Sequence, residues 1–328
     1  MDHLLNLRPM SFMVMMSFWA AAMAQGVPSL TAKTIETRTD GERVTVDMAG
    51  RPVLVYRYSD TPFKPYVSLL YTPGGINILR DSPPDHVHHH GLMYAVSIDG
   101  VDFWAEFDKA SNGKQVHRGI DSRVRQNARS ARVVVSGWVD WQAPDGTVLA
   151  QEKRKVSVVQ REGLDATLVT WRTELATAEG RTRMELTGHH YFGLGMRFVE
   201  SMDKIGRFIN DKNDPGEHVR GSERLVRAHW CAYTSKVDGQ PVTVAMFDHP
   251  ENVRSARWFT MTTPFAYLSA TLNLHEQPLT VKRSEPLRLT YGVAVWDGVK
   301  TSGEIEALYE KWLQWSGAIA QGSSTINP

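Results

Sequence analysis

Four histidines stand within five consecutive positions of this 328-residue sequence. They lie in the segment Asp85–Gly91, which reads DHVHHHG and follows two prolines. Imidazole titrates near neutral pH and is a common ligand of transition metals. The cluster therefore predicts an acid–base site or a site for one divalent metal ion, with His86, His88 and His90 as candidate metal ligands. The alternative is a solvated turn whose histidines pack locally.

Two carboxylates and a tryptophan, Asp102, Trp104 and Glu106, follow these histidines. If residues 91–97 form a strand and residues 99–100 form a hairpin turn, the next segment returns antiparallel beside that strand. We then expect Glu106 to act near the histidines as a catalytic base, with Asp102 and Trp104 as substrate contacts. The alternative places Trp104 in the core and the Asp102 carboxylate on turn amides.

A second cluster spans residues 188–197, where His189, His190, Tyr191 and Arg197 lie among three glycines. Glycine within a strand often marks a close approach of backbone or ligand. We interpret the segment as the wall of a site, with His189 and His190 as candidate catalytic residues. Tyr191 and Arg197 are candidate substrate contacts.

A third cluster follows an apolar strand-like run and contains Asp248, His249 and Asn252. Polar residues at the end of a strand can line the rim of a sandwich and contact a substrate there. A turn with local hydrogen bonds explains the same residues equally well.

The elements that must position these residues are mostly strands. Apolar and polar residues alternate at period two, as in half-buried antiparallel strands. The segments are 132–135, 156–159, 166–171, 242–246 and 287–295. Asp-Gly pairs that suit tight hairpins recur at 40–41, 99–100, 145–146, 238–239 and 297–298. The pattern predicts an all-β fold, a large antiparallel β-sandwich.

One helix is expected near the C-terminus. Ser302 can cap it, and Ile305, Leu308, Trp312 and Trp315 fall at helical spacing on one face. We expect the two tryptophans to anchor the helix against the sandwich.

The N-terminus reads as a secretory signal peptide. Arg8 precedes the apolar run 11–22, and Ala22-Met23-Ala24 provides a cleavage site of small residues. We therefore expect a signal peptide at 1–24 and a single domain at 25–328, with an ordered core at about 30–316. No later run approaches the roughly 20 apolar residues of a membrane span. These features predict a secreted or periplasmic protein without membrane insertion after cleavage.

Composition restricts the partners. The chain has 37 Lys and Arg against 36 Asp and Glu, a net charge of +1, and its basic residues are spread along the sequence. This argues against nucleic acid as a partner and favours a small or uncharged molecule. Cys231 is the only cysteine, so no internal disulfide can form, and we expect it to be buried and inert.

The three clusters, together with residues 62–66 and 79–83, resemble the signature of a bacterial family catalogued as methane oxygenase PmoA-like. The resemblance covers most of the predicted mature chain. It implies an oxygenase that holds copper or iron on the histidines. The membrane subunit of that name has several spanning helices, whereas this chain has none after its signal, so methane oxidation is not carried over.

The segment His189–Leu194 resembles the His-X-Tyr-Phe-Asn-Leu motif of galactose mutarotase-like β-sandwiches, with Gly193 in place of the asparagine. The resemblance implies a supersandwich fold, His189 as the catalytic acid and the His88–His90 group as sugar contacts. The base in that family is a glutamate on a late strand. Residues 265–273 contain none, and Glu276 and Glu285 are the nearest candidates. This departure favours glycoside cleavage or epimerisation over mutarotation.

These observations lead to one functional hypothesis and two alternatives. The hypothesis is an exported carbohydrate-active enzyme in which His189 or His190 donates a proton and Glu106 or His90 accepts one. A divalent metal could assist, and His88 and His89 would contact the sugar or oligosaccharide. The first alternative is a carbohydrate-binding protein without turnover. The second, a minor one, is the metal-dependent oxygenase.

Overall fold

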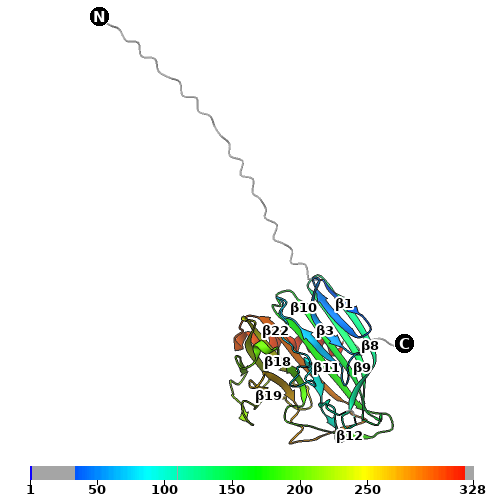
Figure 1. The fold of residues 1–328 in the computed structure, drawn as a ribbon. Coiled ribbons are helices and arrows are strands. Elements are labelled where there is room, and N and C mark those ends of the chain that lie inside the picture. The colour runs from blue at the N-terminus through cyan, green and yellow to red at the C-terminus, as the bar shows by residue number, and fades with distance from the viewer. Residues whose placement is uncertain (2–33, 109, 322–328) are drawn as a thin grey trace. The chain divides into compact units, whose positions relative to one another are not determined.

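Two large antiparallel β-sheets face each other across the buried core (Figure 1). The computed structural model describes residue 1 and residues 34–108 and 110–321. These residues form three antiparallel sheets, one short 3₁₀ helix η1 (Glu200–Met202) and one α-helix, α1 (Ser302–Gln321). The prediction of an all-β sandwich with one C-terminal helix is confirmed.

Hydrogen bonding joins the strands of each sheet in an order that differs from their order in the sequence. From one edge to the other, the ten-stranded sheet contains β1 (Ile35–Thr39), β2 (Arg43–Met48), β3 (Arg51–Arg57), β4 (Tyr66–Leu70), β5 (Leu92–Ala95), β13 (Gly193–Arg197), β20 (Tyr267–Thr271), β19 (Arg257–Met261), β16 (Arg224–Arg227) and β15 (Glu217–His218). The eight-stranded sheet contains β14 (Arg207–Asn210), β17 (Trp230–Val237), β18 (Gln240–Asp248), β22 (Leu287–Asp297), β11 (Thr167–Thr177), β10 (Val148–Arg161), β9 (Ser130–Gln142) and β8 (Lys114–Gln126). The small sheet contains β21 (Leu279–Lys282), β12 (Arg183–Thr187), β6 (Ser97–Ile98) and β7 (Val101–Asp102).

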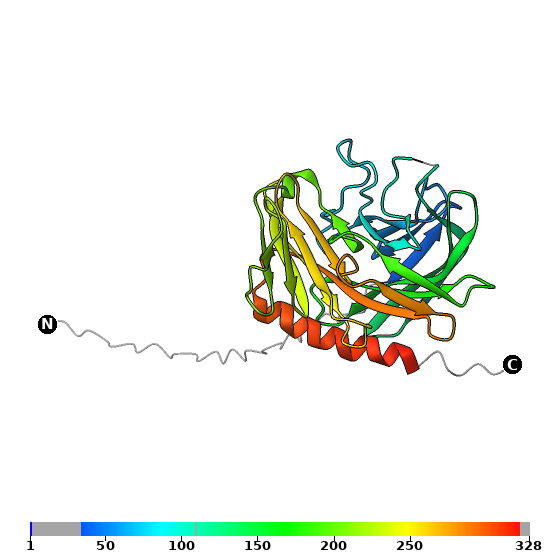
Figure 2. The same ribbon diagram turned by 90° about the horizontal axis from the view of Figure 1, so that it is seen from below.

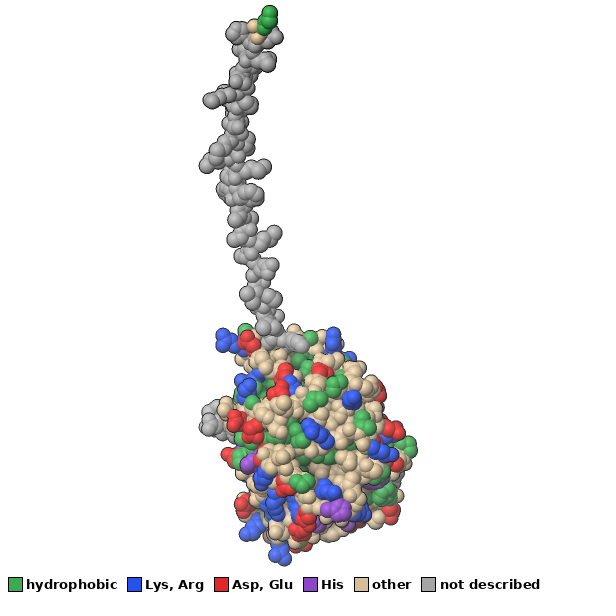
Figure 3. Space-filling view, turned by 90° about the vertical axis from the view of Figure 1, so that its left-hand side faces the viewer, with side chains coloured by type: hydrophobic (Ala, Val, Ile, Leu, Met, Phe, Trp, Pro, Cys, Tyr) green, Lys and Arg blue, Asp and Glu red, His purple; other side chains and the backbone are tan. Residues whose placement is uncertain are grey.

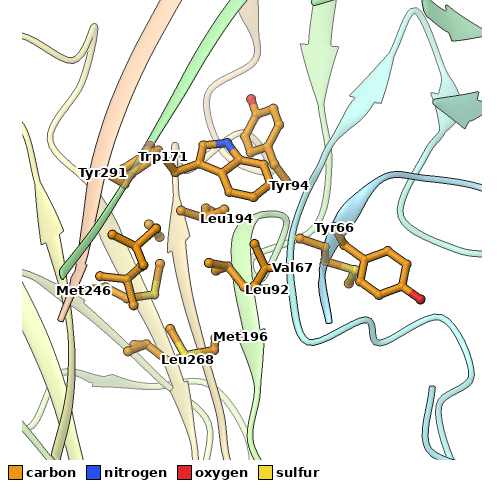
Figure 4. Packing of buried hydrophobic residues seen from close by; sticks show 14 of the residues in the cluster. Tyr66, Val67, Leu92, Tyr94, Trp171, Leu194, Met196, Met246, Leu268 and Tyr291 are labelled. Carbon is orange, nitrogen blue, oxygen red and sulfur yellow. The ribbon is translucent and has the colours of Figure 1, made fainter. Parts of the chain in front are cut away.

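Side chains from both large sheets meet in one core. Figure 4 shows Leu194 and Leu268 of the ten-stranded sheet close to Trp171 and Met246 of the eight-stranded sheet. Alternate residues of each strand point inward because side chains in a strand face opposite sides in turn. The five predicted strand segments belong to strands of the eight-stranded sheet, with Ala166 alone falling just before its strand β11. The glycine of each Asp-Gly pair has a positive φ of 81–90°.

Helix α1 covers part of the outer face of the eight-stranded sheet. Figure 2 shows the red helix lying along one side of the strands. Ile305, Leu308 and Trp312 are buried against it, as the helical spacing predicts. The N-cap is Thr301, one residue before the expected Ser302. The Thr301 hydroxyl accepts from the Glu304 amide at 3.3 Å, and the Glu304 carboxylate accepts from the Thr301 amide at 2.9 Å, which is a capping box.

Other sequence expectations have different outcomes. Cys231 is buried, and burial raises the pKa of its thiol, as expected for an inert residue. Apart from Met1, the predicted signal peptide lies outside the described residues. Within the residues that the structure describes, no helix is long and apolar enough to cross a membrane. Figure 3 shows a face on which basic and acidic side chains are interspersed.

A buried ion pair connects the two large sheets. On β10, the Arg154 guanidinium contacts the Glu152 carboxylate at 2.6 Å, and both side chains are almost completely excluded from solvent. Arg154 also donates to the carbonyl of Pro65, just before β4, and to the side chain of Gln115, each at 2.8 Å. Gln115 in turn donates to the carbonyl of Tyr94 on β5. One guanidinium therefore anchors the strands on either side of the histidine cluster.

We predict that Arg154→Met lowers the free energy of unfolding by about 3–5 kcal/mol, because it leaves the Glu152 carboxylate buried without its cation. Denaturant unfolding followed by circular dichroism measures the change. Arg123→Met, which changes an exposed arginine of β8, is the matched control and should stay within about 0.5 kcal/mol of wild type. Equal stabilities of the two variants would contradict the assigned role.

Candidate functional site

A cavity of about 430 Å³ lies where the histidine loop meets the ten-stranded sheet. Five segments outside the strands, together with β19 and β20, form its walls. The lining residues are Asp85, His86, His88, His89, Trp104, Phe107, Tyr191, Arg220, Glu223, Phe259, Met261, Pro264, Phe265 and Tyr267. Three segments that are far apart in the sequence, 85–91, 102–106 and 188–197, therefore meet around one space.

The loop between β4 and β5 presents three of the four clustered histidines to this cavity. An isolated β-bridge between Asp81 and His90 closes the loop. Two turns inside it are held by hydrogen bonds that the backbone amides of His86 and His89 donate. The rings of His86 and His89 stack at 4.6 Å, and those of His88 and His89 meet edge to face at 4.5 Å. Because this segment forms tight turns and not a strand, neighbouring side chains do not alternate between two faces, and consecutive histidine rings can face the cavity together.

Gly195 on β13 creates the space for the aromatic floor of the cavity. A Cβ atom at this position would lie 2.1 Å from the Tyr267 hydroxyl and 3.0 Å from the Trp104 ring. Any larger residue would displace both aromatic side chains. The expectation that glycines in this segment allow a close approach is therefore met at Gly195.

Four polar atoms of the lining residues are buried and have no hydrogen-bond partner among the described residues. They are His88 Nδ1, His89 Nδ1, Trp104 Nε1 and Tyr267 Oη. Leaving such an atom unpaired costs about 1–3 kcal/mol, so folded proteins seldom keep several together without a reason. All four atoms are closed off from solvent, so they lie just behind the surface of the cavity and not on it.

The imidazoles of His88 and His89 are held neutral. Burial, followed by the nearby Lys64 cation, lowers the pKa of His88 to about 4. Burial also lowers the pKa of His89 far below its ordinary value, and the neighbouring His88 adds to the effect. Each neutral ring offers one donor and one acceptor, which suits hydroxyl groups and proton transfer.

His90 turns away from the cavity into a buried ion network. Its Nε2 atom lies 3.0 Å from the Glu106 carboxylate and its Nδ1 atom lies 2.9 Å from that of Asp81. The fully buried Lys64 ammonium donates to Glu106 and, at 3.0 Å, to the carbonyl of Trp104. Tyr66 stacks on the His90 ring at 4.2 Å and donates to Asp81 at 2.9 Å.

The paired charges of this network offset the effect of burial, which disfavours the charged form of each group. Burial disfavours the imidazolium, but bonds to Asp81 and Glu106 hold the pKa of His90 above its ordinary value. Burial likewise disfavours ionised Glu106, yet His90 and Lys64 keep the pKa of its carboxyl low. Glu106 does lie beside a clustered histidine, as expected. Neither it nor His90 is among the lining residues, however, so the structure places these two predicted catalytic groups behind the cavity wall.

The other two predicted catalytic histidines also lie outside the lining. His189 is exposed and stacks on Tyr191 at 5.6 Å. His190 lies behind Glu223, with its Nε2 atom 3.1 Å from that carboxylate. Glu223 lines the cavity and is also held by the Arg220 guanidinium at 2.9 Å. The second cluster therefore reaches the cavity through Tyr191 and, indirectly, through Glu223.

Asp102 and Arg197 take structural positions. The Asp102 carboxylate accepts from the Trp104 amide at 2.6 Å and from the Ala105 amide at 3.3 Å, which is the alternative turn role. Arg197 is buried beneath the cavity, with its guanidinium 3.5 Å from the centre of the Phe265 ring. It contacts Asp85 at 3.3 Å and does not itself line the cavity.

The third cluster belongs to a different part of the molecule. Asp248 is buried and accepts from the Ala256 amide and the Asn252 side chain, both at 2.7 Å. The ring of His249 meets Trp312 of α1 edge to face at 5.6 Å. These residues support a turn beneath the helix, so the predicted substrate contacts Asp248, His249 and Asn252 are not brought to the cavity.

The predicted metal trio His86, His88 and His90 does not fit a metal ion. His90 directs both ring nitrogens at carboxylates of its own network, whereas His86 and His88 face the cavity. In the described ranges 34–108 and 110–321, no three His, Cys, Asp or Glu residues are grouped as metal ligands. The geometry therefore does not support these three histidines as ligands of one ion.

Several lining residues had no sequence signal of their own, above all Glu223, Phe107 and Tyr267. Tyr267 lies in the segment where the mutarotase-like pattern would place a late-strand glutamate, and its aromatic character was the only available hint. The two nearest glutamates in the sequence lie outside the lining: Glu276 pairs with Arg257 at 3.0 Å, and Glu285 closes a turn. Glu223 reaches the cavity only because β15 and β16 form a hairpin at the edge of the sheet.

The family of the chain follows from comparison with family models. The match covers residues 43–310 and is described as a family of unknown function, DUF6807. The chain belongs to this family. The resemblance to the PmoA-like family is not supported by this comparison, and no curated protein matches the chain.

Among solved structures, the chain is similar to GH36 α-galactosidases from Geobacillus stearothermophilus. AgaB aligns with a TM-score of 0.47 at 10% identity and AgaA with 0.42 at 11%, each over 81% of this chain and 41% of the other. The galactosidase domain of the α-galactosidase-sucrose kinase AgaSK aligns at 0.45 and 10%, with the same coverage. The chain thus spans about two fifths of their length, and likeness at this level does not transfer an activity.

We predict that the stability contributed by His90 falls as pH rises. A folded-state pKa above the unfolded value of about 6.5 adds stability that is fully present below that pH and is lost as pH rises through the folded pKa. The difference in unfolding free energy between wild type and His90→Gln should therefore be larger at about pH 6 than at about pH 9. Urea unfolding at both pH values measures it.

The matched control is His218→Gln, at an exposed position of β15, whose difference from wild type should stay small at both pH values. A His90→Gln difference that grows towards alkaline pH would contradict the charged state assigned to this ring.

Proposed function

We propose that this protein binds a neutral sugar in the cavity and acts on it by acid–base chemistry. The observation that carries the proposal is an aromatic lining that also contains the imidazoles of the histidine loop and the carboxylate of Glu223. Sugar binding needs this combination, since apolar ring faces pack on aromatic side chains while hydroxyl groups seek donors and acceptors. The predicted signal peptide places such a protein outside the cytoplasm.

Charge favours a neutral ligand over an anionic one. The lining carries the carboxylates Asp85 and Glu223 against the single cation Arg220, and His88 and His89 are neutral because burial lowers their pKa. An anionic ligand would therefore meet no excess of positive charge. Hydroxyl groups can donate to the lining carboxylates, and they can both donate to and accept from a neutral imidazole.

Two walls of the cavity supply groups for proton transfer. Glu223, held in place by His190 and Arg220, stands on one side. The imidazole of His88 stands on another, and with a pKa of about 4 it can accept a proton as a carboxylate base does. In this arrangement Glu223 acts with a cavity histidine, while Glu106 and His90 hold the loop from behind. Glycoside cleavage and epimerisation both need such a pair.

The alternative function is sugar binding without turnover. The observation that favours it is the position of three predicted catalytic residues, because Glu106 and His90 are locked in the buried network and His189 is outside the lining. The two functions share the same binding mode and differ only in whether a product forms.

We predict that Tyr267→Phe and Trp104→Phe each weaken sugar binding by about fivefold or more, since each changes the wall of the cavity and removes a polar atom that has no partner within the described part of the chain. Calorimetric titration with a panel of neutral mono- and oligosaccharides measures this. Tyr71→Phe, outside the cavity, is the control. The free Tyr267→Phe protein should unfold at the same or a higher temperature than wild type, which separates the effect from misfolding. The proposal would be contradicted if both variants bound sugar with the affinity of wild type, or if no sugar of the panel bound to the wild-type protein.

We predict that Glu223→Gln reduces turnover by about 10²–10⁴-fold while sugar affinity stays within a few-fold, because the amide keeps the shape and loses the proton transfer. Chromatography of the products after incubation with glycosides measures turnover. Glu217→Gln, an exposed glutamate on β15, is the matched control. If wild type binds a sugar and releases no product from any of the glycosides, sugar binding without turnover is the function.

A further inference from the structure

The outer face of the eight-stranded sheet is divided between the helix and a basic surface. Helix α1 packs on the part of this face formed by β17, β18, β22 and the start of β11. Further along, outward-pointing positions carry Lys153 and Lys155 of β10 and Arg172 of β11. The sequence spreads its basic residues evenly, but the pairing of the strands collects these three.

Register places the cations side by side. Lys155 is directly opposite Arg172 across the β10–β11 pair, and Lys153 is opposite Glu174. Glu174 is in turn opposite Arg288 on β22. Cross-strand partners on one face have Cβ atoms about 5 Å apart, so like charges there repel each other unless a counter-ion lies between them.

A groove of about 510 Å³ runs over these residues and ends at the helix. Four basic side chains line it, and only Arg288 has a close carboxylate partner, Glu174 at 3.1 Å. Lys153, Lys155 and Arg172 form no ion pair within the described part of the chain. Glu251, the other acidic residue of the groove, is almost fully exposed to solvent.

Arg172 is held in place, and neither Arg172 nor Lys155 has a carboxylate partner within the described part of the chain. The Arg172 guanidinium donates to the carbonyl of Ser316 in α1 at 2.7 Å, which fixes its position. Burial lowers the pKa of Lys155, and the adjacent Lys153 and Arg172 lower it further. An anion in the groove would relieve this repulsion, and a planar carboxylate suits the forked donors of an arginine.

An exposed aromatic residue lies next to these cations. Trp138 of β9 is directly opposite Lys153 and keeps 42% of its surface exposed. An exposed indole offers a flat apolar face to a sugar ring, and it has no such use for a free inorganic anion. Aromatic face and cations together therefore select a ring that carries a negative group.

We propose that this groove binds an acidic saccharide, with a uronate carboxylate between Lys155 and Arg172 and a sugar ring against Trp138. The groove shares no lining residue with the cavity. It is a second binding site, and it stands or falls independently of the function proposed for the cavity. It would hold the protein on an acidic glycan.

The test is binding of oligogalacturonate at low salt, measured by calorimetry beside a neutral oligosaccharide of equal length and inorganic polyphosphate. Lys155→Gln/Arg172→Gln and the milder Lys153→Gln should each weaken oligogalacturonate binding, the double variant by about tenfold or more because it removes two charge-assisted contacts. Trp138→Ala should weaken it by about fivefold. Arg43→Gln, an exposed arginine of β2 in the other large sheet that is already paired with Asp40, is the matched control.

Three outcomes overturn the proposal: no binding of oligogalacturonate, binding that the groove variants leave unchanged, or polyphosphate binding of equal strength that ignores Trp138→Ala. Oligogalacturonate binding that falls in the groove variants and persists in Tyr267→Phe supports it. That pattern holds whatever the outcome for the cavity, so failure of one site is distinguishable from failure of the other.

Discussion

The three consecutive residues Lys64, Pro65 and Tyr66 connect the core of the sandwich to its cavity, and the rest of the site depends on them. The Pro65 carbonyl accepts a hydrogen bond from the Arg154 guanidinium, whose charge is balanced inside the core by the Glu152 carboxylate. On either side of it, Lys64 holds Glu106 and the backbone of Trp104, while Tyr66 holds Asp81. Because buried charges are tolerated only when they are paired, this short segment has little freedom to move. It fixes both ends of the histidine loop at once.

That constraint separates the three consecutive imidazoles of His88, His89 and His90 into two chemical types. His90 is held between two carboxylates, which raise its pKa despite burial, whereas burial without a counter-charge lowers the pKa of His88 and His89. The charged ring serves the scaffold and the neutral rings face the cavity. The ring on one side of the loop is therefore paired within the protein, and the rings on the other side are placed to contact a ligand.

The two faces of the sandwich offer different surfaces for recognition. The cavity beside the ten-stranded sheet combines aromatic rings with neutral imidazoles. The groove on the eight-stranded sheet contains three cations without an ion-pair partner in the described part of the chain, and the exposed indole of Trp138 lies next to one of them. Membership of a family of unknown function does not choose between these surfaces. From the chemistry of each lining, we propose a neutral sugar for the first and an acidic saccharide for the second.

The sequence by itself determined the class of fold and the elements that carry the site. Period-two alternation, the Asp-Gly turns and the spacing of Ile305, Leu308 and Trp312 are local signals, so they predicted the strands and the helix correctly. Clustering of His86, His88 and His89 likewise pointed to the loop that lines the cavity. The sequence pattern did not predict which histidine rings face the cavity, because this segment forms turns and not a strand with alternating side chains.

Tertiary structure alone decided the partners of each group. It withdrew Glu106 and His90 into an ion network and brought Glu223 and Tyr267 to the cavity from distant hairpins. It also gathered Lys153, Lys155 and Arg172 onto one face, although the sequence shows a nearly neutral chain with scattered charge. The physical reason is the same in each case. Burial, charge pairing and strand register depend on contacts between residues far apart in the chain, and such contacts leave no periodic trace in the sequence.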